Sequence, residues 1–217
     1  MRANSYYSRK LHSLLGVIPV GFFLVEHLLT NYSATKGHSD FVDSVLWLNN
    51  MPLIFFLELF LVWLPLAYHA IYGLYVAFTA RNNVTNYGYF RNTMFLLQRV
   101  TGIFTFVFVI WHLYSTRVQV ALGNVSHEEL GTTMHQIAGN PVFFVLYVVG
   151  ILSAVFHFSN GMWSFLVSWG ITVGPRAQKV STYIWMGVFV IMSVMFIMSL
   201  TAFTDPQFSN VPVISHK

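Results

Sequence analysis

The stretch PVFFVLYVVGILSAVFHFSNGMWSFLVSWG, residues 141–170, decides the fold class of this chain. It contains no charged residue and is longer than the roughly 20 residues that a helix needs to cross a bilayer. Its one histidine, His157, is costly in such a segment unless it is paired or ligated. The stretch therefore predicts a membrane-spanning helix that carries a functional side chain.

Working outward, four further apolar stretches predict helices of the same kind. The chain has 217 residues, of which 56% are hydrophobic and 8% charged, whereas soluble domains carry about 25% charged residues. The five predicted helices lie at about 11–31, 53–80, 94–117, 141–170 and 181–203. Pro19 and Pro65 predict kinks in the first two. We expect an all-α integral membrane protein, with residues 1–217 as one membrane domain and the first four of its five transmembrane helices forming a four-helix bundle.

Charge distribution predicts the orientation of these helices. If the N-terminus is cytoplasmic, eight of the eleven lysines and arginines face the cytoplasm and every acidic residue lies in the outer half or outside. The inner group is Arg2, Arg9, Lys10, Arg81, Arg91, Arg99, Arg176 and Lys179, and the outer group is Lys36, Arg117 and Lys217. The positive-inside rule therefore favours a cytoplasmic N-terminus and an external C-terminus. Because the basic residues separate apolar runs, they indicate topology and not nucleic-acid binding.

The chain has no cysteine, which excludes disulfides, iron–sulfur ligation and c-type haem attachment within this polypeptide. Histidine is the strong transition-metal ligand that remains. Each of the first four predicted helices carries one, and a rise of about 1.5 Å per residue sorts them by depth. His27 and His112 fall in an outer layer, and His69 and His157 fall nearer the cytoplasm.

Two similar halves of the sequence give the same pairing. The matching positions are Gly16 with Gly102, His27 with His112, His69 with His157, and Gly73 with Gly161. Gly73 and Gly161 each follow a histidine by one helical turn, so they predict room for a planar ligand on the same face. Two facing imidazoles in a helical bundle are suited to a haem iron, and a bis-histidine iron transfers electrons. The pattern predicts two b-type haems.

Other interpretations of the four histidines remain open. Each could be a packed residue that is hydrogen-bonded to a neighbouring helix. A zinc or copper site would need the ligands to converge at one depth, and a transporter could use them as a proton relay. His38, His127, His135 and His216 are expected to be solvent-exposed in outer segments or the tail.

Several ionisable residues have two interpretations, one purely structural and one functional. Arg9 and Arg99 lie at cytoplasmic helix ends, where they either set topology or bind haem propionates, and Arg117 could do the same for the outer haem. His12 is either interfacial or placed at a propionate or quinone. Glu26 and Glu58 are either interfacial or part of a proton path.

The chain resembles a known family in specific segments. These are Arg9–Gly16 leading to Glu26-His27-Leu28, and Gln98–Gly102 leading to His112-Leu113, together with the histidines of the second and fourth helices. They are similar to the dihaem cytochrome b membrane anchors of succinate dehydrogenase from Gram-positive bacteria, which belong with the dihaem fumarate reductase anchors. The resemblance covers essentially the whole chain.

The resemblance implies two haem b groups and a menaquinone site in a bacterial cytoplasmic membrane. It also implies that a flavoprotein subunit and an iron–sulfur subunit dock on the cytoplasmic face, and we expect residues 81–92 and 174–179 to contact the latter. The predicted function is electron transfer from the iron–sulfur subunit through the haems to quinone, with succinate oxidised elsewhere. An anchor of a hydrogenase or formate dehydrogenase is the alternative. We expect the quinone site at the outer end, and the alternative site is an inner one near His12 and Arg99.

Overall fold

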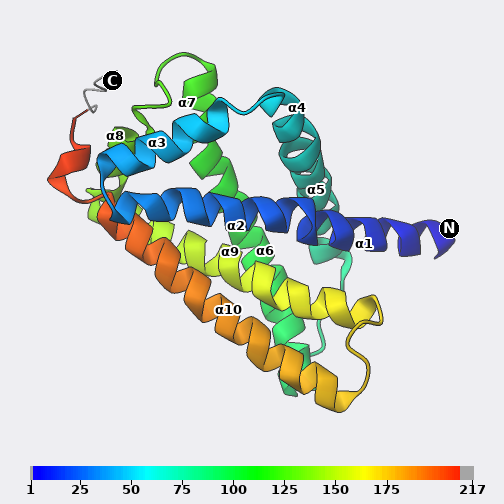
Figure 1. Ribbon diagram of the computed structural model, residues 1–217. Coiled ribbons are helices and arrows are strands. Elements are labelled where there is room, and N and C mark those ends of the chain that lie inside the picture. Colours follow the sequence, from blue (N-terminus) through cyan, green and yellow to red (C-terminus); the bar gives the residue numbers. More distant parts are fainter. Residues whose placement is uncertain (1, 211–217) are drawn as a thin grey trace.

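Residues 2–210 are described by the computed structural model, and within that range the chain is helical with no strand (Figure 1). His216 and Lys217 lie outside the described residues. The helices are α1 (Arg2–Val17), α2 (Pro19–Tyr32), η1 (Ser33–Thr35), α3 (His38–Asn49), α4 (Ile54–Leu57), η2 (Glu58–Trp63), α5 (Leu64–Thr79), α6 (Phe90–Ser115), α7 (Arg117–Ala121), α8 (Leu130–Ala138), α9 (Pro141–Ser168), α10 (Pro175–Ala202) and η3 (Pro206–Phe208).

Among the described residues, five helical segments are long and apolar enough to cross a membrane, which confirms the predicted fold class. They are Tyr6–Thr35, Ile54–Thr79, Phe90–Ala121, Pro141–Ser168 and Pro175–Ala202. The first, third and fifth begin earlier than predicted, at Tyr6, Phe90 and Pro175. Hydropathy locates the apolar part of a helix, whereas backbone hydrogen bonding continues into the charged turns that hold Arg91, Arg176 and Lys179.

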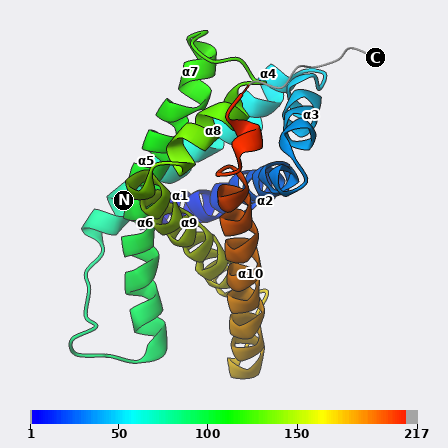
Figure 2. The same ribbon diagram turned by 90° about the vertical axis from the view of Figure 1, so that its left-hand side faces the viewer.

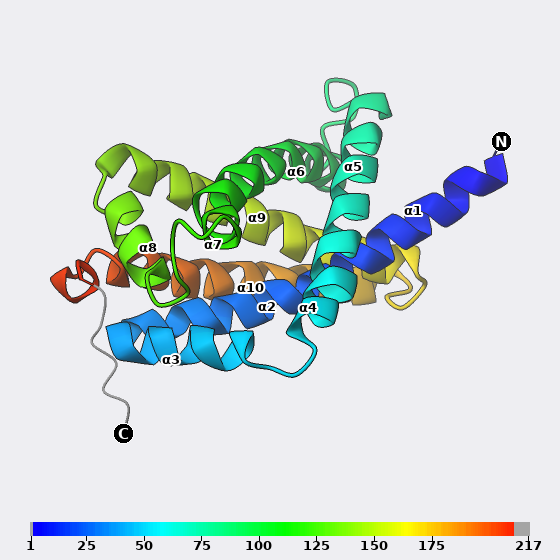
Figure 3. The same ribbon diagram turned by 90° about the horizontal axis from the view of Figure 1, so that it is seen from above.

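The helices are irregular at Pro19 and Pro65, the two prolines at which kinks were predicted. The first span divides at Ile18, directly before Pro19, so that α1 and α2 form one rod with a bend between them (Figure 3). In the second span, a π-helical segment, η2, lies just before Pro65. A proline lacks the N–H that a regular helix would use and crowds the preceding turn, which accounts for both positions.

The first, third and fifth spans pack against α9. The hairpin of α9 and α10 is antiparallel, α6 packs along another side of α9, and α5 lies against α1 (Figure 3). Figure 2 shows two distinct ends of the molecule. We call the end that holds α3, α7, α8 and η3 the capped end. The opposite end, with residues 80–89 and 169–174, is called the hairpin end.

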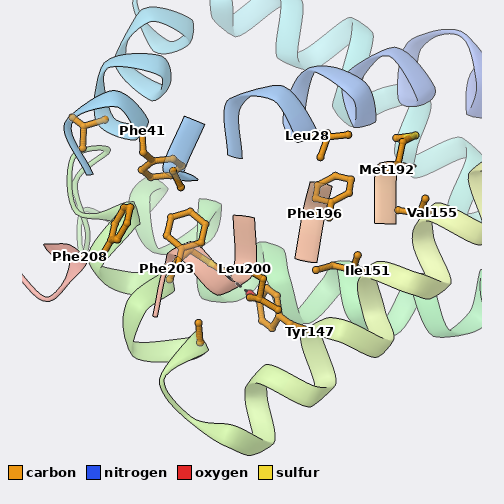
Figure 4. Close-up of a cluster of buried hydrophobic side chains, with 14 residues drawn as sticks. Leu28, Phe41, Tyr147, Ile151, Val155, Met192, Phe196, Leu200, Phe203 and Phe208 are labelled. Carbon is orange, nitrogen blue, oxygen red and sulfur yellow. Dashed lines mark hydrogen bonds between the residues drawn. The ribbon is translucent and has the colours of Figure 1, made fainter. Parts of the chain in front are cut away.

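The segments between spans at the capped end are more ordered than their polar sequence indicated. Residues 38–49 and 130–138 form α3 and α8, and their apolar sides pack on the ends of α9 and α10 (Figure 4). Phe203 contacts Phe41 and Phe208 with ring centroids 5.0 and 5.1 Å apart. The capped end is therefore a packed layer over the spans.

The expectation that His38 is solvent-exposed is wrong. Its side chain is 5% exposed, and its Nδ1 lies 3.0 Å from the backbone carbonyl of Gln207. His127 and His135 are half-buried. The error arises because η3 returns over α3 from the far end of the chain, a contact that no local pattern indicates.

Candidate functional site

The structure brings the four span histidines together as two facing pairs. The ring centroids of His27 on α2 and His112 on α6 are 5.8 Å apart, and the ring planes make an angle of 73°. Those of His69 on α5 and His157 on α9 are 6.0 Å apart at 79°. These are the pairs that depth and sequence repetition predict.

The two pairs occupy different layers along the spans. Tyr147 on α9 lies beside His112, with ring centroids 5.9 Å apart. His157 is ten residues further along the same helix, which corresponds to about 15 Å of axial rise. The His27–His112 pair lies toward the capped end and the His69–His157 pair toward the hairpin end.

Both histidines of the pair nearer the hairpin end have a hydrogen-bond partner at Nδ1. His69 Nδ1 donates to the backbone carbonyl of His12 over 3.0 Å, and His157 Nδ1 donates to that of Gln98, also over 3.0 Å. A carbonyl can only accept, so the proton of each neutral ring is on Nδ1. The Nε2 lone pair of each ring is thereby available to a metal, which is the usual arrangement around ligating histidines.

The pair nearer the capped end is held by side chains. His112 Nδ1 lies 3.2 Å from the hydroxyl of Tyr147, and that hydroxyl donates to Met134 Sδ at 3.9 Å. The tyrosine oxygen is therefore the acceptor for His112. On α2, the Asn31 amide nitrogen lies 3.3 Å from Nε2 of His27 and donates to the His27 carbonyl over 2.8 Å.

Two glycines give the His69–His157 rings their space. A Cβ on Gly16 would overlap the His69 ring, and one on Gly102 would lie 2.9 Å from Cε1 of His157. The glycines that predicted a cleared face, Gly73 and Gly161, have a different role: their neighbours are the His12 ring and the Gln98 amide. Gly73 and Gly161 thus make room for the His12 and Gln98 side chains. The space that was predicted there for a planar ligand is taken by these two side chains.

His12 lies against the histidine pair and not at the surface. Its ring stacks on that of His69, with centroids 4.2 Å apart and planes inclined by 3°. Its Nε2 is buried without a hydrogen-bond partner. The structure thus places His12 beside the pair nearer the hairpin end.

The arginines and Glu58 adopt contacts that the sequence did not indicate. Arg117 forms an ion pair with Glu58 at 2.8 Å, so these two residues neutralise each other. Arg99 donates to the backbone carbonyl of Ala80 over 2.9 Å, and Arg9 is exposed. Arg99 therefore closes the hairpin end of α5 and α6.

Glu26 lines a groove between α2 and α3 near the capped end. The groove has a volume of about 550 Å³, and its walls include Phe22, Trp47, Thr30 and Asp43. Thr30 donates a hydrogen bond of 2.6 Å to the Glu26 carboxylate. Glu26 immediately precedes His27, so the groove lies at the depth of that histidine, on a different side of α2.

Sequence reasoning missed the polar residues that hold His157. The Gln98 side chain donates to the His157 carbonyl over 2.9 Å and accepts from Asn160 over 2.7 Å. Asn160 is 2% exposed. A buried amide in an apolar span needs partners, and that signal could have identified Asn160.

Among residues 2–210, no three histidine or acidic side chains gather in one place where a metal ion could be held. His27 with His112 and His69 with His157 instead form two pairs in the two layers described above, and His12 stacks on His69.

Comparison with known proteins assigns the family. Residues 81–196 match the family described as succinate dehydrogenase/fumarate reductase transmembrane subunit. The chain belongs to this family. It is also 48% identical over 200 residues to the succinate dehydrogenase cytochrome b558 subunit of Bacillus subtilis strain 168, a match that covers 92% of this chain and 98% of the relative. The family that the sequence resembles is thereby confirmed, and a transporter or an anchor of the hydrogenase type is disfavoured.

Proposed function

We propose that this chain is the dihaem cytochrome b anchor of a succinate dehydrogenase, and that it connects an iron–sulfur subunit to membrane menaquinone. The observation that carries the proposal is the presence of two facing histidine pairs in a transmembrane subunit of this family. These pairs are His27 with His112 and His69 with His157. The name of the Bacillus subtilis relative supports both the enzyme and the b-type cytochrome.

The residues present fit two haem b groups. Three of the four histidines have a hydrogen-bond acceptor at Nδ1, which leaves Nε2 for iron. The imidazole rings face each other without stacking, and Gly16 and Gly102 leave the space that His69 and His157 occupy. When bound, each haem would supply a one-electron carrier, and the two histidines of its pair would hold the iron, an arrangement suited to electron transfer.

We further propose that a flavoprotein subunit and an iron–sulfur subunit dock at the hairpin end, on the cytoplasmic side. Arg81 is exposed there, and so are the aromatic side chains of Tyr87, Tyr89 and Phe90. Exposed aromatic residues next to a cation are typical of protein interfaces. The excess of basic residues on this side supports the cytoplasmic orientation.

Menaquinone is proposed to bind at the capped end, in the groove between α2 and α3. The groove joins apolar and aromatic walls, Phe22 and Trp47, to the hydrogen-bonding groups of Glu26 and Thr30. This combination of apolar walls and a few polar groups is typical of sites for small cofactors. Glu58 is less suited to binding quinone because Arg117 already occupies its carboxylate.

The complex purified with this chain should reduce a menaquinone analogue at the expense of succinate, and succinate should reduce both b-type spectral components.

Replacing Glu26 with glutamine should lower kcat/KM for the naphthoquinone by about tenfold, because a hydrogen bond to a charged group is lost. A Glu58→Gln variant is the matched control and should retain activity within about twofold, because Glu58 does not line the groove and its carboxylate contacts Arg117. Absence of succinate-dependent haem reduction would contradict the enzyme assignment. An equal loss of kcat/KM in the Glu26→Gln and Glu58→Gln variants would argue against quinone binding in the groove.

Tyr147 gives a test of the pair nearer the capped end that leaves the ligands in place. In a Tyr147→Phe variant, His112 Nδ1 loses its acceptor, and the imidazole becomes a weaker electron donor to iron. We expect the midpoint potential of that haem to rise while the other haem keeps its potential. A redox titration followed in the visible spectrum measures both, and a shift in the other haem alone would refute the assignment of Tyr147 to this layer.

A further inference from the structure

The hairpin end contains an open cavity whose lining includes neither histidine pair. It lies between the end of α9, the turn at 169–174 and the start of α10, and its volume is about 660 Å³. Its polar lining residues are Thr172, Arg176 and Ser181, and its apolar walls include Val180 and Ile184.

Two hydroxyl groups that line this cavity have no hydrogen-bond partner within residues 2–210. Ser181 is 4% exposed, and neither its Oγ nor the Oγ1 of Thr172, both buried, has a hydrogen-bond partner among the described residues. Buried polar atoms are nearly always satisfied. A ligand that accepts hydrogen bonds would satisfy both of the hydroxyls that line this cavity.

The charge around the cavity favours an anion. Arg176 is exposed in the first turn of α10, and the chain has no aspartate or glutamate between Leu130 and Thr204 that could neutralise it. The helix begins after Gly174, which provides no side-chain cap. The amides of Arg176 and Ala177 thus belong to the first turn, where N–H groups lack partners within the helix and attract negative charge.

The apolar walls identify the kind of anion. Val180 and Ile184 are 50% and 56% exposed, and they lie on a helix that is apolar enough to cross the membrane. A ligand that fills this cavity meets cationic and hydroxyl groups at the helix start, and an exposed apolar surface one and two turns further along the helix. Polar groups followed by an apolar surface along the helix match a phospholipid whose headgroup lies at the membrane boundary.

We propose that this cavity binds the phosphate-bearing headgroup of an anionic phospholipid from the bilayer leaflet at the hairpin end. Arg176 and the first-turn amides of α10 bind the phosphate, Ser181 and Thr172 donate hydrogen bonds, and the acyl chains lie along Val180 and Ile184. Basic pockets between helices at a membrane boundary are suited to such headgroups. The bound lipid would link the end of α9 to the start of α10.

The test measures lipid retention by the full-length protein, purified in mild detergent with whatever subunits accompany it. Wild-type protein is exposed to equal amounts of phosphatidylglycerol and phosphatidylcholine and washed, and the bound lipid is quantified by mass spectrometry. We expect preferential retention of phosphatidylglycerol. Arg176→Gln should weaken it about fivefold, the effect of one arginine near a charged membrane surface, and Arg176→Lys should restore most of it. Ser181→Ala should weaken retention without changing charge.

Lys179→Gln is the matched control, since Lys179 is an exposed cation in the same turn that does not line the cavity, and it should retain lipid as the wild type does. Thermal denaturation of wild-type protein with added phosphatidylglycerol or inorganic phosphate separates a lipid from a free anion: only the lipid should raise the melting temperature. Equal retention of both lipids, equal loss in Arg176→Gln and Lys179→Gln, or stabilisation by phosphate alone would overturn the proposal. So would unchanged retention in Arg176→Gln with loss of a soluble subunit, which would assign the cavity to protein docking.

Discussion

Replacing His69 with alanine should remove one of two haems, and replacing His157 should remove the same one. Alanine cannot ligate iron, and each ring is one half of a facing pair whose centroids are 6.0 Å apart. The His27→Ala and His112→Ala variants should both lose the other haem, because those rings form the second pair at 5.8 Å. Haem content per chain, with a redox titration of the reduced-minus-oxidised spectrum, measures which component is lost.

The double variant sharpens this test. Because a pair acts as one site, His69→Ala with His157→Ala should lose no more haem than either change alone, whereas His69→Ala with His112→Ala should lose both. His127→Gln is the control, since His127 lies between α7 and α8, outside the spans and both pairs. Loss of one and the same component in the His27 and His69 variants would show that the pairing is wrong.

A methyl group on Gly16 should have nearly the same consequence as loss of a ligand. An added Cβ would overlap the His69 ring, so the ring must move away from its partner. Overpacking of a closely packed interior costs about 1–3 kcal/mol, and here the strain acts on a candidate iron ligand. We expect Gly16→Ala to lose or strongly perturb the haem nearer the hairpin end while the other spectral component remains. Gly102→Ala should act on the same haem more weakly, since its Cβ would lie 2.9 Å from His157.

Gly187 offers the matched control for these substitutions. It lies within α10, and a Cβ added there would meet no atom within 4 Å. Gly187→Ala should therefore leave both spectra unchanged and could stabilise the helix by about 0.5–1 kcal/mol. If Gly16→Ala had a native spectrum and native haem content, the assignment of Gly16 to the clearance of His69 would fail.

The spans and the pairing of histidines were predictable because both depend on position along one axis. Hydropathy marks where a helix crosses the bilayer, and rise per residue gives the depth of His27, His69, His112 and His157 without any knowledge of their neighbours. The repetition of glycine and histidine between the two halves added a second, independent indication. The family resemblance rested on the same residues and is confirmed by the comparisons.

Contacts perpendicular to that axis were not predictable from the sequence. The ion pair of Arg117 with Glu58 joins residues 59 positions apart on different helices, and nothing local in either segment indicates the other. The burial of His38 depends on η3, which follows the last span. In both cases the missing information is which helices are neighbours, and hydropathy does not contain it.

The spacing of Gly16 from His27, and of Gly102 from His112, has a consequence for how such a chain can evolve. Each of these two spans contributes a proposed ligand to one layer and a glycine that makes room for a histidine in the other, eleven and ten residues apart. Inserting or deleting a single residue between them would rotate one element by about 100° and shift it by about 1.5 Å relative to the other. Both of the proposed haem sites would then be impaired at once. We therefore expect these intervals to tolerate many substitutions while retaining a fixed length.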